Sequence, residues 1–228
     1  MIAAFGLLNT SAFAEETTTL DPIVVSADFR ENNISKVSGS FCLISEADIY
    51  DKSTQAFAEV VASEPNVNFS SGASKAKYIQ IRGIGERSQF ITPINPSVGI
   101  IVDGIDFSQS TLGVTMYDLK QIEVLRGPQG TTFGANGLAG VVNIESNDPM
   151  EELGGHIEAT VGNYNTKALG LTLNAPIVED KLLSRFSIYK NSSDGYMTNR
   201  HIDSDGNQIN RDDTNNIDEM SAKAKFRW

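Results

Sequence analysis

The stretch that decides the fold is Ile122-Glu123-Val124-Leu125-Arg126-Gly127-Pro128-Gln129-Gly130, which continues through Thr131-Thr132-Phe133-Gly134-Ala135-Asn136-Gly137 to Gly140-Val141-Val142-Asn143-Ile144. A β-branched strand meets an Arg-Gly-Pro turn, a glycine-dense loop follows, and a second apolar strand begins. Pro128 fixes its own φ and lacks a backbone donor. The glycines of the stretch, which allow backbone angles or close approaches that side chains forbid, are Gly127, Gly130, Gly134, Gly137 and Gly140. The stretch therefore predicts a tightly folded backbone that packs against another surface.

Composition and charge exclude several classes of protein. The chain has 228 residues and a formal net charge of −11, which argues against a nucleic-acid binder because that function needs a basic patch. Cys42 is the only cysteine, so no disulfide or cysteine-based metal site can form within the chain. His156 and His201 lie far apart and show neither metal-ligand nor catalytic spacing. We therefore expect no enzymatic activity, no cofactor and no bound metal.

Residues 1–14 have the pattern of a signal peptide. An apolar run at residues 2–8 precedes the small-x-small sequence Ala12-Phe13-Ala14. No Lys or Arg precedes the run, so either the true start lies upstream or the segment is not a signal. The run is far shorter than the ~20 apolar residues of a spanning helix, and no other stretch is long enough. Any membrane insertion must therefore use β-strands.

Residues 15–40 are polar and predict a flexible arm, interrupted by one apolar island at residues 20–27. Pro22 and the β-branched residues after it favour an extended conformation. Such a segment suits strand addition to the sheet edge of a partner, and it equally suits a buried first strand. The residues alone leave both interpretations open.

Residues 41–149 predict a compact α+β unit. We expect a strand at 41–45, a short helix near 46–52 that a Ser45–Asp48 capping box begins, and a second helix that Pro65 ends. Further strands are expected at 78–83 and at 98–107, where an Asp103-Gly104 turn divides the strand. One helical turn is expected over 116–119.

Residues 150–228 have a different pattern, in which apolar and polar residues alternate. The last of these segments places Met220, Ala222, Ala224, Phe226 and Trp228 on one face and Ser221, Lys223, Lys225 and Arg227 on the other. This is the pattern of a membrane β-barrel strand, apolar toward lipid and polar toward the lumen; a soluble sandwich shows it with the sense reversed. A short turn at 175–181 and a long polar segment at 191–218 favour the barrel, of which about four strands are expected.

These features together resemble the N-terminal part of a TonB-dependent outer-membrane receptor, and the resemblance covers essentially the whole chain. The segments similar to the plug-domain signatures of that family are Tyr78-Ile79-Gln80-Ile81-Arg82-Gly83, Val102-Asp103-Gly104 and the stretch quoted at the start. They are specific in combination. Pro96-Ser97-Val98-Gly99-Ile100 resembles the branch of the family that takes up iron complexes.

The resemblance implies a plug domain inside a barrel of about 22 strands. It implies a TonB box, the segment that pairs with the inner-membrane TonB protein, at Asp21, Pro22, Ile23, Val24, Val25 and Ser26. It also implies that Arg82 and Arg126 sit against carboxylates of the barrel wall. The plug loop is implied to fold to the shape of the lumen, and its residues are Gly127, Pro128, Gly130, Gly134 and Gly140.

The implied function is active uptake of a scarce nutrient, above all a ferric siderophore or another iron complex. The implied location is the outer membrane of a Gram-negative bacterium, in contact with its lipid. A different class of function stays open: a truncated, non-transporting remnant or a periplasmic plug-type binding module. Because a closed barrel needs at least ~8 strands, we interpret the chain as truncated and expect it not to transport by itself.

Overall fold

The structure is a computed structural model that describes residues 24–25, 32–33, 39–52, 56–71, 76–88, 93–109, 114–178, 181–202, 204–207 and 211–228. The predicted signal peptide at 1–14 lies outside the described residues, as does most of the predicted arm at 15–40. Two short strands of the arm are described, β1 (Val24–Val25) and β2 (Asn32–Asn33), and they pair antiparallel.

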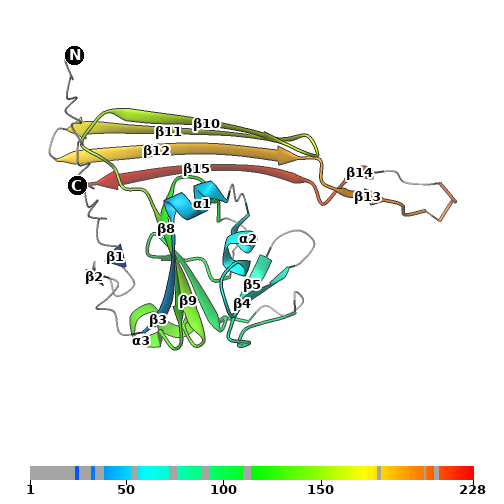
Figure 1. Cartoon of the computed structure of the whole chain (residues 1–228), viewed down its shortest axis with the longest axis horizontal. Helices are drawn as coiled ribbons and strands as arrows, with labels where there is room; N and C mark the ends of the chain where they lie inside the picture. The colour runs from blue at the N-terminus through cyan, green and yellow to red at the C-terminus, as the bar shows by residue number, and fades with distance from the viewer. Residues whose placement is uncertain are drawn as a thin grey trace, which may run out of the picture.

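The described chain forms two layers. A plug, made of a mixed sheet with small helices, lies beneath a long curved sheet that we call the wall (Figure 1). The plug sheet consists of β3 (Ser40–Ser45), β8 (Leu119–Arg126), β9 (Gly140–Ser146), β6 (Val98–Val102) and β7 (Ile105–Asp106), in that order across the sheet. The two strands of the deciding stretch, β8 and β9, are antiparallel neighbours at its centre, whereas β6 runs parallel to β9.

Two helices cover one face of the plug sheet and close its core. They are α1 (Glu46–Asp51) and α2 (Phe57–Ala62), and the capping box predicted for Ser45 and Asp48 begins α1. The core beneath them consists of β-branched and aromatic residues, among them Ile44, Phe57, Val60, Val61, Ile122, Val124 and Ile144. A separate hairpin of β4 (Val67–Ser71) and β5 (Ala76–Ile81) follows α2. Among the described residues, no helix has the length and apolar character needed to cross a bilayer.

Two local predictions in the plug are wrong. The helical turn expected over 116–119 is absent, because Asp118 adopts a left-handed φ of 57° and β8 begins at Leu119. The glycine-dense segment expected as a loop contains a short helix, α3 (Gly130–Phe133), and a 3-10 turn, η3 (Gly134–Asn136).

The close packing of the deciding stretch is internal to the plug. A Cβ built on Gly140 would lie 2.6 Å from Cδ1 of Ile81 and closer still to the Leu125 carbonyl. A Cβ on Gly137 would lie 3.1 Å from the backbone of Gln129, within the same segment. At these two positions glycine therefore lets backbone meet backbone inside the plug, not against the wall.

The wall is a four-stranded antiparallel sheet of consecutive long strands. It consists of β10 (Gly154–Gly162), β11 (Thr166–Val178), β12 (Leu182–Ser193) and β15 (Ile217–Arg227). The expected turn at 175–181 is shorter than predicted, because β11 continues through Pro176 with a shift in register. The long polar segment after β12 contains a further short hairpin, β13 (Met197–Asn199) with β14 (Arg211–Thr214).

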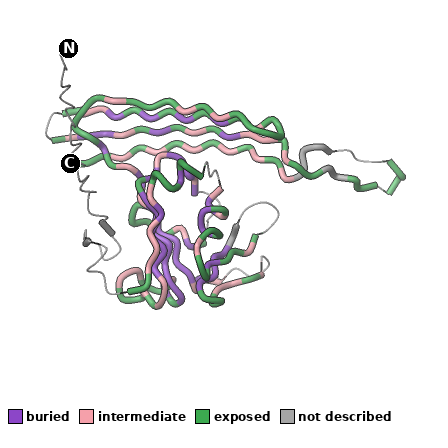
Figure 2. Tube along the Cα trace, in the orientation of Figure 1, coloured by how far each residue is buried: buried purple, intermediate pink, exposed green. Residues whose placement is uncertain are grey.

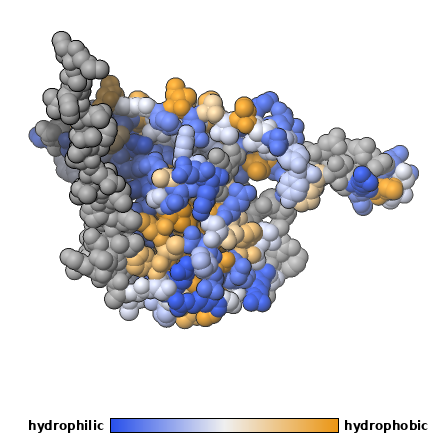
Figure 3. Space-filling view, viewed as in Figure 1, coloured by the Kyte–Doolittle hydropathy of each residue, from blue (hydrophilic) through white to orange (hydrophobic). Residues whose placement is uncertain are grey.

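In the wall, apolar side chains are exposed and polar side chains are buried, which is the reverse of a soluble sheet. Ile157 on β10 is 72% exposed, whereas Ser187 on β12 is 3% exposed. Figure 2 shows buried residues alternating with more exposed ones along β11 and β12, whereas β15 alternates between intermediate and exposed residues. Apolar side chains are seen on the outer side of the wall in Figure 3. An apolar outer face and a polar inner face confirm the predicted fold class, a plug followed by antiparallel strands of a barrel wall.

Replacing Gly140 by Ala should destabilise the plug by about 2 kcal/mol, because the added methyl overlaps the Leu125 carbonyl and Ile81. Urea denaturation of the refolded chain measures this loss. Gly130→Ala is the matched control, since a Cβ there meets nothing within 4 Å. Equal stabilities of the two variants would contradict the packing described.

Candidate functional site: the contact between plug and wall

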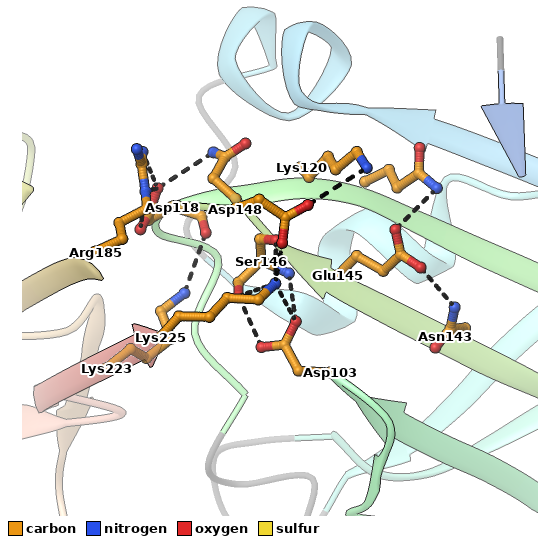
Figure 4. Close-up of polar contacts among 12 residues, drawn as sticks. Asp103, Asp118, Lys120, Asn143, Glu145, Ser146, Asp148, Arg185, Lys223 and Lys225 are labelled. Atoms are coloured by element: carbon orange, nitrogen blue, oxygen red, sulfur yellow. Dashed lines mark hydrogen bonds and ion pairs between the residues drawn. The ribbon is translucent and has the colours of Figure 1, made fainter. Parts of the chain in front are cut away.

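The candidate site is the polar contact between the inner face of the wall and one end of the plug sheet. The described contacts come from plug residues just after β6, just before β8 and just after β9 (Figure 4). On the wall they come from β11, β12 and β15, whose alternation points every second side chain inward.

The strongest contact joins Asp118 of the plug to Arg185 of β12. The guanidinium donates from Nη2 to Oδ1 at 2.6 Å and from Nε to both carboxylate oxygens at 3.1 Å, a forked geometry that suits this pair. The Asp118 side chain is 6% exposed and that of Arg185 13%. Burial alone would raise the pKa of Asp118, but the hydrogen bonds and charge of Arg185 outweigh burial and lower it.

Two lysines of β15 extend the contact. Lys225 bridges Asp148 at 2.8 Å and Asp103 at 3.4 Å, and it also donates to the Ser146 carbonyl at 3.1 Å. Lys223 donates to the backbone carbonyls of Tyr117 and Asp118 at 2.6 Å and 3.2 Å. Asp103 in turn accepts from the backbone N–H and hydroxyl of Ser146, which fixes its carboxylate at the end of β9.

The wall places like charges side by side at this contact. Arg185 and Lys225 are direct cross-strand partners in the register of β12 and β15. Like charges directly opposite each other destabilise a sheet. Asp118 and Asp148 of the plug each bind one of the two cations, so the plug supplies the counterions that this pair needs.

Tyr117 adds an apolar anchor beside the charges. Its ring stacks on Tyr189 of β12 with a centroid distance of 5.0 Å, and its hydroxyl lies 2.9 Å from that of Thr172 on β11. The ring rests on Gly170, where a Cβ would lie 2.5 Å from Cζ of Tyr117 and closer to Cε2. Gly170 is therefore a socket in the wall that only the absence of a side chain leaves open.

A cavity of about 700 Å³ lies next to this anchor, between α1, the residues before β8 and strands β10–β12. Carboxylates of Glu46, Asp51 and Glu158 line it together with His156. Its volume is that of a small-molecule site. Glu46 and Asp51 belong to α1 and Glu158 to β10, whereas Arg185 of β12 lines the same cavity.

The arginines and the TonB box predicted from the sequence are not part of this contact. Arg126 lies 3.8 Å from Glu64 within the plug, and Arg82 is exposed in a turn with a φ of 54°. Their pairing with carboxylates of a barrel wall stays a prediction. Of the proposed TonB box only Val24 and Val25 are described, as β1; the other four residues lie outside the described residues.

The structure adds functional residues that sequence reasoning missed. Asp103 was noted only as a turn residue, and Asp118 was placed inside a helical turn. The alternation of β15 did predict that Lys223 and Lys225 face inward. Nothing in the pattern indicated which plug residues they meet, since the partners lie more than 70 residues away in the chain.

Comparison with known families finds proteins similar to this chain. Residues 33–141 match the family model described as the TonB-dependent Receptor Plug Domain. The chain is 26% identical over 200 residues to the pesticin receptor of Yersinia enterocolitica and 24% identical over 208 residues to the vitamin B12 transporter of Vibrio vulnificus. Each alignment covers 87% of this chain, but only 29% and 32% of those proteins.

A solved structure shows the same fold. The ferric yersiniabactin uptake receptor of Yersinia pestis superposes with a TM-score of 0.68 at 23% identity, over 82% of this chain and 28% of that one. The chain thus spans about a third or less of the length of the proteins it matches.

Gly170→Val should displace Tyr117 and break its stack on Tyr189, because a side chain at 170 occupies the place of the ring. We expect loss of the near-ultraviolet circular dichroism of the tyrosine pair and about 2 kcal/mol of stability. Gly162→Val is the control, since a Cβ there makes only an ordinary contact of 3.5 Å with Thr166. An unchanged tyrosine signal in Gly170→Val would contradict the socket.

Asp118→Asn should cost about 3 kcal/mol at neutral pH, because it leaves Arg185 buried without its counterion. The pKa of Asp118 in the folded chain lies below its ordinary value of 3.8. Its contribution is therefore complete above that pH and is lost as pH falls through the lower, folded-state pKa. Urea titrations between pH 7 and pH 2 should show a smaller acid loss in Asp118→Asn than in the parent chain.

The control for this titration is Asp51→Asn, an exposed carboxylate at the end of α1. It should leave the stability at neutral pH unchanged. An acid loss that is identical in all three proteins would show that Asp118 does not carry it.

Proposed function

We propose that this chain, which belongs to the TonB-dependent outer-membrane receptors, acts in the active uptake of an iron complex. The single observation that carries the proposal is the plug seated by ion pairs on the polar face of a wall whose other face is apolar. Proteins of this family are receptors and transporters rather than enzymes.

The seating of the plug explains why uptake needs an energy source. Several charge-assisted hydrogen bonds hold the plug to the wall, and each is stronger than a neutral hydrogen bond because an ionised group takes part. A plug held in this way blocks passage until work is done on it. The outer membrane has no ATP supply, so we infer that the work arrives as a pull through a partner protein, TonB.

The arm is the place where such a pull would act. The proposed TonB box at residues 21–26 precedes β3, which is an edge strand of the plug sheet and pairs only with β8 among the described strands. An extended segment that adds to the sheet of a partner can carry tension along its backbone. A force on the arm would therefore reach the plug at β3.

The wall supports contact with lipid. Leu169, Leu171 and Leu173 of β11 and Phe186 and Ile188 of β12 are exposed on its outer face. Phe186 packs edge-to-face on Phe226 at a centroid distance of 5.7 Å on that same face. A continuous apolar outer surface suits the acyl chains of a bilayer.

An iron complex is the ligand class that we favour, because the sequence around Pro96 resembles the iron-complex branch and one similar structure is that of a ferric-siderophore receptor. A cobalamin is the competing ligand, since one relative carries that name. An uptake experiment with iron complexes and with cobalamin distinguishes these two ligand classes.

In a full-length version of the receptor, deleting residues 20–27 should abolish uptake of the labelled ligand by the cells that express it, while binding of the ligand to the cell surface persists. Accumulation of radiolabelled ferric siderophores, haem and cobalamin measures uptake under iron starvation. Val24→Pro should reproduce the deletion, because proline removes a backbone donor from the pairing strand. Thr18→Pro, outside the box, is the control.

Uptake that survives both changes would overturn TonB coupling at this segment. Absence of uptake of every ligand by the unmodified receptor would favour the non-transporting alternative.

A further inference from the structure

Four cations form a strip on the inner face of the wall. They are Arg185 on β12 and Lys223, Lys225 and Arg227 on β15. The three residues of β15 alternate with outward-facing apolar residues, so all three point to the same side. Arg185 and Lys225 are neighbours in the register of β12 and β15, so the strip is continuous across the two strands.

The acceptors described for Arg185, Lys223 and Lys225 are all residues of the plug. Arg185 binds the Asp118 carboxylate, Lys225 binds those of Asp148 and Asp103, and Lys223 binds two carbonyl oxygens. Burial raises the pKa of Asp148, but the hydrogen bond and charge of Lys225 outweigh burial and lower it. The charge of Arg227 lowers this pKa further. If the plug shifts away, the strip therefore loses its counterions together.

We propose that the strip is an anion-binding surface that the plug carboxylates occupy in the docked state and that a small polyanionic ligand occupies when the plug moves. The chemical class is a complex or chelator that carries several carboxylate, phenolate or sulfonate oxygens. The role in passage rests on the proposed uptake function. The plug carboxylates act here as internal substitutes for the ligand.

The position of the strip along the wall indicates which side of the membrane it lies nearer to. Arg227 pairs with Leu183, immediately after the short connection between β11 and β12, whereas the acidic Glu219 pairs with Asn191 at the other end of the same two strands. In bacterial barrels the short turns face the periplasm and the long loops face outward. The cations therefore lie in the periplasmic half of the wall.

The electrostatics across the wall sharpen the choice of ligand. On the inner face of the wall, β10 presents Glu158 to the cavity, and β12 and β15 present the cations, of which Arg185 also lines the cavity. A surface lined by one sign of charge raises the local concentration of the opposite sign. An anion would therefore be attracted to β12 and β15, where the cations lie, rather than to Glu158 on β10.

The test measures binding of citrate, a tricarboxylate probe, to the whole chain in zwitterionic detergent at low ionic strength, by isothermal titration calorimetry. The variant Asp103→Asn/Asp118→Asn/Asp148→Asn removes the competing carboxylates of the plug. It should bind citrate about tenfold more tightly than the parent chain, the gain expected from one freed charge-assisted contact. Neither TonB nor uptake takes part in this measurement. A failure of the citrate test therefore leaves the uptake proposal standing, and a failure of the uptake test does not change the binding of citrate.

Replacing lysines shows which cations are responsible for the tighter binding of citrate. Adding Lys223→Gln/Lys225→Gln to the triple variant should remove the tighter binding. Adding Lys167→Gln/Lys190→Gln should not, because these two wall lysines are exposed on the outer face. If the triple variant loses the far-ultraviolet signal of the strands, Asp148→Asn alone repeats the test with a smaller gain, since its side chain is 48% exposed.

Two results would overturn the proposal. One is a folded plug variant that binds citrate no more tightly than the parent chain. The other is a gain that the outer-face lysine replacements abolish as fully as the strip replacements do.

Discussion

The ion pairing between plug carboxylates and wall cations is the interaction on which the two layers depend. Arg185 and Lys225 repel each other across the strands, and Asp118 and Asp148 need partners because the plug partly buries them. Each layer therefore carries buried or half-buried charges that the other layer helps to compensate. This explains why the polar contact is confined to one end of the plug sheet, where Asp103, Asp118 and Asp148 meet at neighbouring strand ends.

The same pairing decides which side of the wall faces the membrane. Alternation of polar and apolar residues fits a soluble sandwich as well as a membrane wall, and only the neighbouring layer distinguishes them. Here the neighbour is a charged plug, so polar residues such as Ser187 and Asn174 are buried beneath the sheet and the leucines of β11 are left outside. Glycine allows close packing at two places, at Gly140 within the plug and at Gly170 between plug and wall.

Local patterns predicted most of the elements, and long-range contacts limited the rest. The period of two in the wall strands and the Ser45–Asp48 capping box were sufficient for β10, β11, β15 and α1. The segment before β8 was misjudged because its backbone is set by contacts of Tyr117 and Asp118 with strands far along the chain. The partner of a charged side chain depends on how the layers dock, and the sequence carries no local signal for that.

The socket at Gly170 also bears on how the wall is assembled. Glu158, Gly170, Tyr189 and Ser221 form one row across the four strands. A slip of β11 by one residue would bring Leu169 or Leu171 under the ring of Tyr117, and a slip by two would bring Ala168 or Thr172. None of these leaves room for the ring, so the plug fits only a wall whose hydrogen-bond ladder is correctly aligned. Docking of Tyr117 at Gly170 and the register of β11 therefore depend on each other.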